Sequence, residues 1–141
     1  MKHTQKGQTL LELVIAIGVV AIIITGLVIA ATSSLRYGQE SRLRSTAVKY
    51  AQEGLELARQ IRDTQPPATF LSYAGVHCLD YQGNWTDGSS GCGPIQSGSP
   101  FTRIVTFAWA DPTMTVTSEV RWSLGGTQTS TQLQTYLTQW R

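Results

Sequence analysis

The sequence predicts an α+β protein, in which a long amino-terminal helix with a membrane half and an amphipathic half packs on a three-stranded antiparallel sheet. Three patterns support this prediction. Residues 13–35 carry no charge, residues 43–61 repeat apolar side chains every three or four positions, and residues 114–124 alternate apolar and polar side chains. Such patterns are typical of a membrane helix, a helix with one buried stripe and a half-buried strand, respectively.

The apolar segment near the amino terminus is long enough to span a bilayer. Leu13 to Leu35 is 23 residues, and a helix of that length measures roughly 34 Å. One carboxylate, Glu12, lies at its edge, and an ionised carboxylate in apolar surroundings is costly unless it is paired. Two interpretations remain open, because Glu12 either reaches water at the membrane surface or pairs with a cation.

Cleavage after Gly7 would create such a cation. Gln8 would then carry a free α-amine one helical turn before Glu12, where opposite charges are neighbours. In a bundle of such helices, the carboxylate of one chain would equally neutralise the amine of the next, which would set an assembly register.

Residues 6–13, Lys-Gly-Gln-Thr-Leu-Leu-Glu-Leu, resemble the processing site of type IV pilins and type II secretion pseudopilins. In that family a basic leader and a glycine precede the cut, and a glutamate is the fifth mature residue. The resemblance covers residues 1–35. It implies that a prepilin peptidase cuts between Gly7 and Gln8 and methylates the Gln8 amine, and that Glu12 guides docking with other pilin subunits. The sequence departs from the family in two ways, since Gln8 replaces the usual phenylalanine and the apolar helix contains no proline.

The sequence is expected to comprise five segments: a leader peptide (1–7), a transmembrane and assembly helix (8–35), its amphipathic continuation (36–63), a disulfide-containing loop region (64–100) and an antiparallel sheet (101–141). Basic residues lie on both sides of the apolar segment: Lys2 and Lys6 before it, and Arg36, Arg42, Arg44 and Lys49 after it. Their count argues weakly against an internal amino terminus. The cysteines and the resemblance nevertheless place the amino terminus in the cytoplasm and the carboxy-terminal domain outside. The chain is then a single-pass protein of the inner or cytoplasmic membrane as a precursor, and later part of a cell-surface pilus or periplasmic pseudopilus. A secretory signal is the alternative, but its apolar core would be shorter.

The second half of the helix is predicted to bury one stripe against the sheet and to end near Thr64, because Gln65-Pro66-Pro67 cannot continue a helix. The stripe comprises Leu43, Ala47, Tyr50, Ala51, Gly54, Leu55, Ala58 and Ile61. Ion pairs at four-residue spacing are expected on the other faces: Glu40 with Arg44, Lys49 with Glu53, and Arg59 with Asp63.

The connection from 64 to 100 is rich in Gly, Ser and Pro and is predicted to be a loop. Cys78 and Cys92 are the only cysteines, and in an exported domain a disulfide between them would close a 15-residue loop and contribute about 3 kcal/mol. Metal binding by these cysteines and His77 is the alternative, although it lacks a fourth ligand. Trp85 and Tyr81 are candidate partner contacts, with packing beneath the loop as the alternative.

Three strands are predicted at residues 101–110, 114–124 and 128–137, joined by turns at Asp111-Pro112 and Gly125-Gly126. Their one apolar face needs a cover, which the helix stripe provides. The helix, loop and sheet together resemble minor pilins more than major ones.

The sequence does not indicate an enzyme. His3 and His77 are the only histidines, and no catalytic set, phosphate-binding loop or metal-ligand run is present. No cofactor or small-molecule substrate is expected, and a net charge of +2 without a basic patch does not favour nucleic acid as a partner. We therefore interpret the chain as a structural subunit, a minor pilin or pseudopilin of a type IV pilus-like filament. The alternative is an uncleaved, single-span extracytoplasmic binding or adhesion module.

Overall fold

The structure is a computed structural model that describes the backbone of residues 6–138 and the side chains of residues 9–138. Its elements are α1 (Lys6–Thr64), α2 (Pro67–Ser72), β1 (Gly75–Leu79), β2 (Trp85–Asp87), β3 (Phe101–Ala110), β4 (Thr113–Leu124) and β5 (Thr127–Thr138). The chain divides into two compact units, residues 1–41 and 42–141, and α1 contributes to both. The predicted α+β class, a long helix followed by an antiparallel sheet, is confirmed.

The helix α1 ends where the sequence predicts. Its last residue is Thr64, whose hydroxyl donates to the carbonyl of Gln60 at 2.7 Å. Pro66 then caps α2, and Pro67 occupies its first turn. Proline is tolerated there because the first amide groups of a helix have no partner inside the helix.

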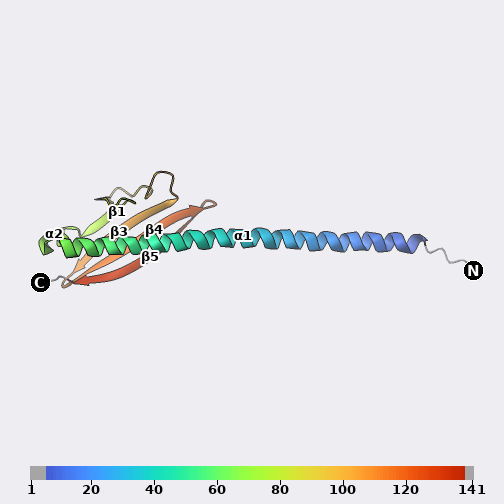
Figure 1. Ribbon diagram of the computed structural model, residues 1–141, viewed down its shortest axis with the longest axis horizontal. Helices are drawn as coiled ribbons and strands as arrows, with labels where there is room; N and C mark the ends of the chain where they lie inside the picture. Colours follow the sequence, from blue (N-terminus) through green and yellow to red (C-terminus); the bar gives the residue numbers. More distant parts are fainter. Residues whose placement is uncertain (1–5, 139–141) are drawn as a thin grey trace, which may run out of the picture. The chain divides into compact units, whose positions relative to one another are not determined.

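The sheet has five strands in the order β2-β1-β3-β4-β5, and all neighbours are antiparallel (Figure 1). The prediction of three strands is therefore wrong in number. The two additional strands, β1 and β2, come from the segment predicted to be a loop, and they are only five and three residues long. Strands this short carry little periodicity, and β1 forms because β3 offers it a partner edge, with Val76 opposite Thr106.

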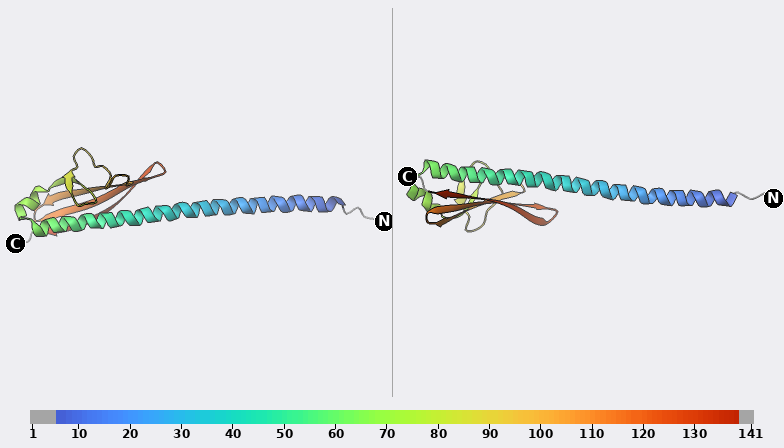
Figure 2. Two further views of the ribbon diagram at one scale, coloured as in Figure 1. Left: turned by 45° about the horizontal axis from the view of Figure 1, so that its top comes forward. Right: turned by 90° about the horizontal axis from the view of Figure 1, so that it is seen from below.

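The second half of α1 covers one face of this sheet (Figure 2). The inward positions of the central strands alternate with outward ones, so Met114, Val116, Val120 and Trp122 of β4 are buried. The predicted helix stripe is confirmed by burial of Ala47, Ala51, Gly54, Leu55, Ala58 and Ile61. The small residues in this stripe let the helix backbone approach the strands closely.

The core of this unit consists of two apolar clusters. Leu55 and Phe107 belong to the first, and Ala51 and Trp122 belong to the second. Between Ala51 and Leu55 lies Gly54, and a Cβ built there would be 2.5 Å from Ser118 Oγ and 3.4 Å from Arg103 Cδ. A glycine is required at this point because the polar side chains of β3 and β4 occupy the space.

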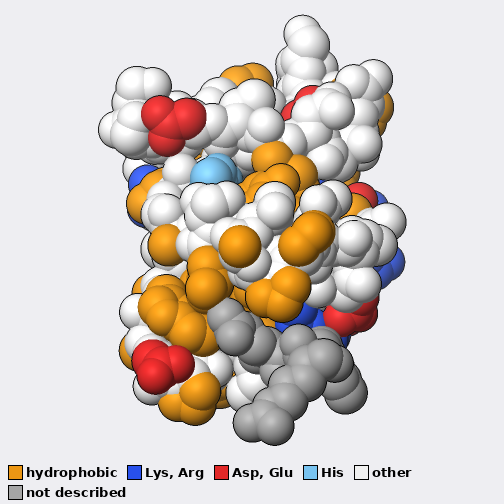
Figure 3. All heavy atoms as spheres, turned by 90° about the vertical axis from the view of Figure 1, so that its left-hand side faces the viewer, with side chains coloured by type: hydrophobic (Ala, Val, Ile, Leu, Met, Phe, Trp, Pro, Cys, Tyr) orange, Lys and Arg blue, Asp and Glu red, His pale blue; other side chains and the backbone are white. Residues whose placement is uncertain are grey.

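One end of the unit formed by residues 42–141 shows more apolar and uncharged side chains than charged ones (Figure 3). Figure 3 shows hydrophobic side chains interspersed with uncharged polar ones on the end of this unit where α1 and α2 meet. Charged residues make up 14% of the sequence, which agrees with this view.

Candidate functional site

The amino-terminal part of α1 exposes its apolar side chains. Residues 9–32 are all exposed, including Leu10 at 66% and Ile22 at 75%. Among residues 6–138, α1 is the one helix long and apolar enough to cross a membrane. The hydroxyls of Thr25 and Thr32 donate to carbonyls one turn earlier in the same helix, at 2.8 and 3.0 Å. Because these polar groups are satisfied within the helix, they add little cost to burial in lipid.

Glu12 lies in the first turns of this helix, four residues after Gln8. Its side chain is exposed, and it forms no ion pair within residues 9–138. Residues 1–5 of the expected leader and the side chains of Lys6 and Gln8 lie outside the part of the chain that is described, so the expected cut between Gly7 and Gln8 is not tested by the structure. The described part thus presents a carboxylate at the edge of an apolar helix surface, where an ionised group is costly unless it is paired.

The disulfide expected from the sequence is present between Cys78 of β1 and Cys92, with Cα atoms 5.3 Å apart. The loop that it closes contains the turn of the β1–β2 hairpin and all of β2, whereas most of β1 precedes it. In the hairpin turn, the Asp80 carboxylate accepts hydrogen bonds from the Gln82 amide at 2.8 Å and from the Asn84 amide and side-chain nitrogen at 2.9 Å. The Asn84 side chain is the main reason that the pKa of Asp80 is lowered. These donors rigidify the turn.

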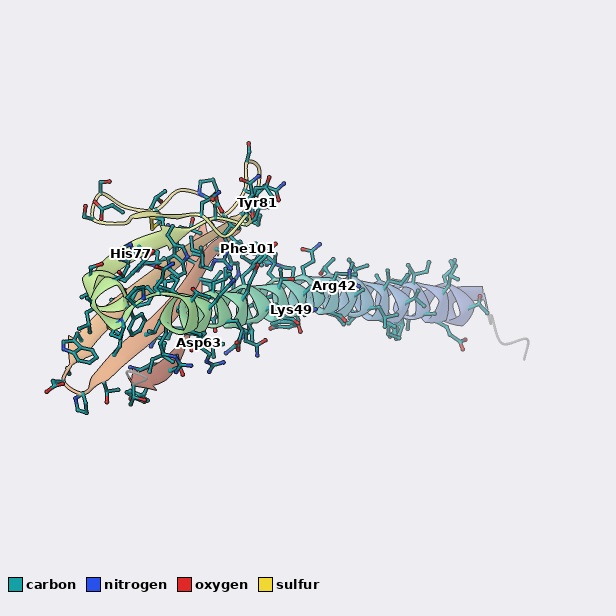
Figure 4. The ribbon with its side chains drawn as sticks, turned by 60° about the vertical axis from the view of Figure 1, so that its left-hand side comes forward. Arg42, Lys49, Asp63, His77, Tyr81 and Phe101 are labelled. Atoms are coloured by element: carbon teal, nitrogen blue, oxygen red, sulfur yellow. A yellow bond between two sulfur atoms is a disulfide. The ribbon has the colours of Figure 1, made fainter. Side chains whose placement is uncertain are left out.

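The two aromatic candidates lie in different surroundings. Tyr81 is 50% exposed, in the turn above the sheet (Figure 4). Trp85 is half-buried, and its ring lies 5.6 Å from that of Phe107 and 6.3 Å from those of Tyr73 and His77. Of the two, only Tyr81 is exposed, which makes it the better placed residue for a surface contact.

The residues of the alternative metal site have other partners. The two cysteine sulfur atoms are bonded to each other, and His77 Nε2 lies 2.9 Å from the carbonyl oxygen of Tyr73. Across the described residues, no group of three His, Cys, Asp or Glu side chains could hold a metal ion.

Arg103 is a structurally important residue whose role the sequence did not reveal. Its side chain is fully buried, and it donates to the Leu79 carbonyl at 3.2 Å, to the Tyr50 carbonyl at 3.1 Å and to the Asp80 carbonyl. Burial lowers the pKa of this guanidinium, and the Glu53 carboxylate opposes that shift. Its position in the sequence could have revealed this role. Arg103 alternates with Phe101 and Val105 on the inward face of β3, and an arginine on that face must find its partners inside the domain.

Glu53 pairs with Arg103 at 3.0 Å and not with Lys49. Arg59 likewise pairs with Glu56, and Asp63 pairs with Arg62 at 2.8 Å. The ion pairs expected at four-residue spacing are therefore absent within residues 9–138. In their place are two ion pairs between residues one or three positions apart in α1, and one ion pair between α1 and β3.

A family model described as the prokaryotic N-terminal methylation motif matches residues 2–28. The match contains Gly7, Gln8 and Glu12 and the first part of the apolar segment. No curated protein and no solved structure matches the chain. Residues 2–28, which include the first part of the exposed apolar helix and its edge carboxylate, are thus similar to the amino-terminal methylation signal found on type IV pilins and pseudopilins.

Proposed function

We propose that the chain is a structural subunit, a minor pilin or pseudopilin, of a type IV pilus-like filament. The methylation motif at residues 2–28 is the observation that carries this proposal. A prepilin peptidase cuts the precursor between Gly7 and Gln8 and methylates the new amine of Gln8. The mature chain acts by assembling and not by catalysis.

Before assembly, the precursor is inserted in the inner or cytoplasmic membrane. Residues 8–35 span the bilayer, and the disulfide-containing domain lies outside. An apolar helix that leaves lipid must find equally apolar surroundings, and the shared core of a filament of such helices supplies them. The exposure of every residue from 9 to 32 supports this role, because the side chains of that segment have no cover within their own chain.

Glu12 sets the stagger of neighbouring subunits in this mechanism. In the apolar filament core, an ionised carboxylate is stable only beside a cation. The methylated amine of Gln8, in the same chain or in the next one, is that cation. The absence of an ion pair for Glu12 within residues 9–138 supports a partner at the new chain end.

Processing is tested by co-expressing the full precursor with a prepilin peptidase and measuring the intact mass and amino-terminal peptide. We expect a chain that begins at methylated Gln8. Gly7→Ala should block the cut. Gly18→Ala is the matched control, because a Cβ at Gly18 meets nothing within 4 Å and the cut should proceed. A mature protein that begins at Met1 would favour a tethered binding or adhesion module.

Assembly is tested separately, with Glu12→Ala and Glu40→Ala compared in cells that make the filament. Both glutamates are exposed on α1 and neither is ion-paired within residues 9–138, but only Glu12 borders the apolar run. Glu12→Ala should be cut normally and fail to enter filaments, whereas Glu40→Ala should enter them. Equal incorporation of both variants would refute the assigned role of Glu12.

A further inference from the structure

The segment that follows the apolar run is strongly basic. Between residues 36 and 49 the chain carries four cations and one anion: Arg36, Arg42, Arg44 and Lys49, against Glu40. All five side chains are exposed. Arg42 and Lys49 lie seven residues apart along α1, and Figure 4 labels both on this helix. Ala47, the first residue of α1 that is buried in the core, lies between them.

The arginines of the chain fall into two groups. Within residues 9–138, every arginine after position 49 is ion-paired: Arg59, Arg62, Arg103 and Arg121. The three arginines before position 49 have no ion pair in that range, and Lys49 has none either. Glu40 lies one turn from Arg44 without pairing to it. The unpaired cations are thus concentrated next to the apolar run.

Along the helix, Arg36 lies at the headgroup layer of a bilayer, and the other three cations lie progressively beyond it. The apolar run of roughly 34 Å slightly exceeds a hydrocarbon core of about 30 Å, so Arg36 begins at the core's edge. Arg42 and Arg44 follow about 10 and 14 Å beyond Leu35, and Lys49 about 21 Å beyond it. Long basic side chains can bend back toward the surface, and charges act over about 8 Å at physiological salt.

We propose that Arg36, Arg42 and Arg44 bind anionic phospholipid headgroups in the leaflet on the domain's side of the membrane. The proposal rests on the membrane-anchored precursor of the proposed function, but not on cleavage or filament assembly. Basic residues beside a membrane helix usually lie on the cytoplasmic side, whereas the proposed orientation places these cations outside. The proposal therefore gives them a binding partner on that side.

The acidic side chains of a second copy are the competing partner. Four of the nine, Glu53, Glu56, Asp63 and Glu119, pair with arginines of their own chain. The Asp80 and Asp87 carboxylates accept hydrogen bonds from neighbouring residues in their own turns. A second copy therefore offers few free carboxylates to this segment, whereas an anionic leaflet offers many.

The test uses the uncleaved full chain reconstituted in phosphatidylcholine bilayers that contain a trace of spin-labelled phosphatidylglycerol or phosphatidylcholine. The immobilised fraction of each label gives the preference of the protein for the anionic lipid. We expect a preference of severalfold at low salt that disappears in 1 M salt. Arg42→Gln and Arg44→Gln should each reduce it by about two- to fivefold, and Lys49→Gln should reduce it less.

Arg121→Gln is the matched control, because Arg121 is exposed but pairs with Glu119 on β4. This variant should keep the preference of the wild type. Near-ultraviolet circular dichroism would verify that all variants remain folded. A wild type without lipid preference, or an equal loss in Arg121→Gln, would overturn the proposal. So would an Arg42→Gln/Arg44→Gln chain that keeps the lipid preference and loses filament incorporation, since that result assigns the cations to a neighbouring subunit. A failure of Gly7 processing leaves this measurement unaffected, so the two proposals fail independently.

Discussion

Arg103 of β3 and Glu53 of α1 form a salt bridge across the helix–sheet interface, with Nη1 3.0 Å from Oε2. The guanidinium is fully buried, whereas 47% of the Glu53 side chain is exposed. The same guanidinium donates to the carbonyls of Tyr50, Leu79 and Asp80. One side chain therefore ties the helix, the sheet and the β1–β2 turn together.

Removing the two partners of this salt bridge should have unequal effects. Arg103→Met leaves three carbonyls without their donor and Glu53 without its countercharge, so we expect a loss of about 3–5 kcal/mol in the free energy of unfolding. Glu53→Gln keeps an acceptor for Nη1 at a half-exposed site and should cost about 1 kcal/mol. Denaturation of the full chain in detergent, followed by near-ultraviolet circular dichroism, measures both. Equal losses would show that the carboxylate, and not the carbonyl contacts, makes Arg103 important.

Gly54→Ala should destabilise the domain, because its Cβ would lie 2.5 Å from Ser118 Oγ. We expect a loss of about 1–3 kcal/mol from overpacking, partly offset by the higher helix propensity of alanine. Ser118→Ala removes a buried hydroxyl that has no hydrogen-bond partner within residues 9–138, so it should be nearly neutral.

The double variant Gly54→Ala/Ser118→Ala should recover part of the loss, which a double-mutant cycle measures. Gly38→Ala is the control, because nothing lies within 4 Å of a Cβ there and the change should be neutral or slightly stabilising. Strict additivity of the two substitutions would show that the hydroxyl is not the obstacle.

Much of this architecture follows from periodicity, and the remainder depends on contacts that periodicity does not reveal. The helix end at Thr64 and the burial of Met114 to Trp122 are local patterns with one physical cause each, so the sequence predicts them. The pairing of Val76 with Thr106 and the reach of Arg103 to Tyr50 join residues far apart in the chain. Such partners exist only once the chain has folded, which is why β1, β2 and the Glu53 pair were not predicted correctly.

The lowered pKa of Asp80 makes the hairpin sensitive to acid. The Asn84 side chain, followed by backbone amides, stabilises the charged carboxylate in the folded state. The contribution of Asp80 to stability is therefore present above its unfolded pKa of 3.8 and is lost as the pH falls through the lower folded value. We expect the unfolding temperature of the wild type to fall more steeply below pH 4 than that of Asn84→Ala. Parallel curves for the two proteins would mean that another carboxylate controls the acid response.

Alanine substitutions of Trp85 and Tyr81 should have different effects, because Trp85 packs in the domain and Tyr81 lies at the surface. Trp85→Ala removes a ring 5.6 Å from that of Phe107 and should cost about 2–4 kcal/mol in the free energy of unfolding. Tyr81→Ala removes a half-exposed ring and should change stability by less than about 0.5 kcal/mol. If the turn contacts a partner, adhesion, uptake or secretion should weaken in the Tyr81 variant at unchanged stability. Normal behaviour in all three assays would exclude Tyr81 as a contact.

Loss of the disulfide should lower the free energy of unfolding, but part of the segment between β1 and β3 should stay packed on the domain. Cys78→Ser/Cys92→Ser opens a 15-residue loop, which costs about 3 kcal/mol in the chain-entropy model. Ile95 remains a second attachment, because its side chain is buried, its amide donates to the Phe101 carbonyl at 2.8 Å and its carbonyl accepts from the Tyr81 amide at 3.1 Å.

Limited proteolysis should therefore cut the serine variant mainly within residues 86–92, while residues 95–100 stay protected. A reductant should lower the unfolding temperature of the wild type toward that of the variant and leave the variant unchanged. Ile95→Ala in the serine background should then expose residues 93–100 as well, since the buried side chain is lost and only the two backbone hydrogen bonds of position 95 still hold this stretch. Early cleavage at 95–100 in the serine variant alone would show that the disulfide, and not Ile95, holds this stretch against the core.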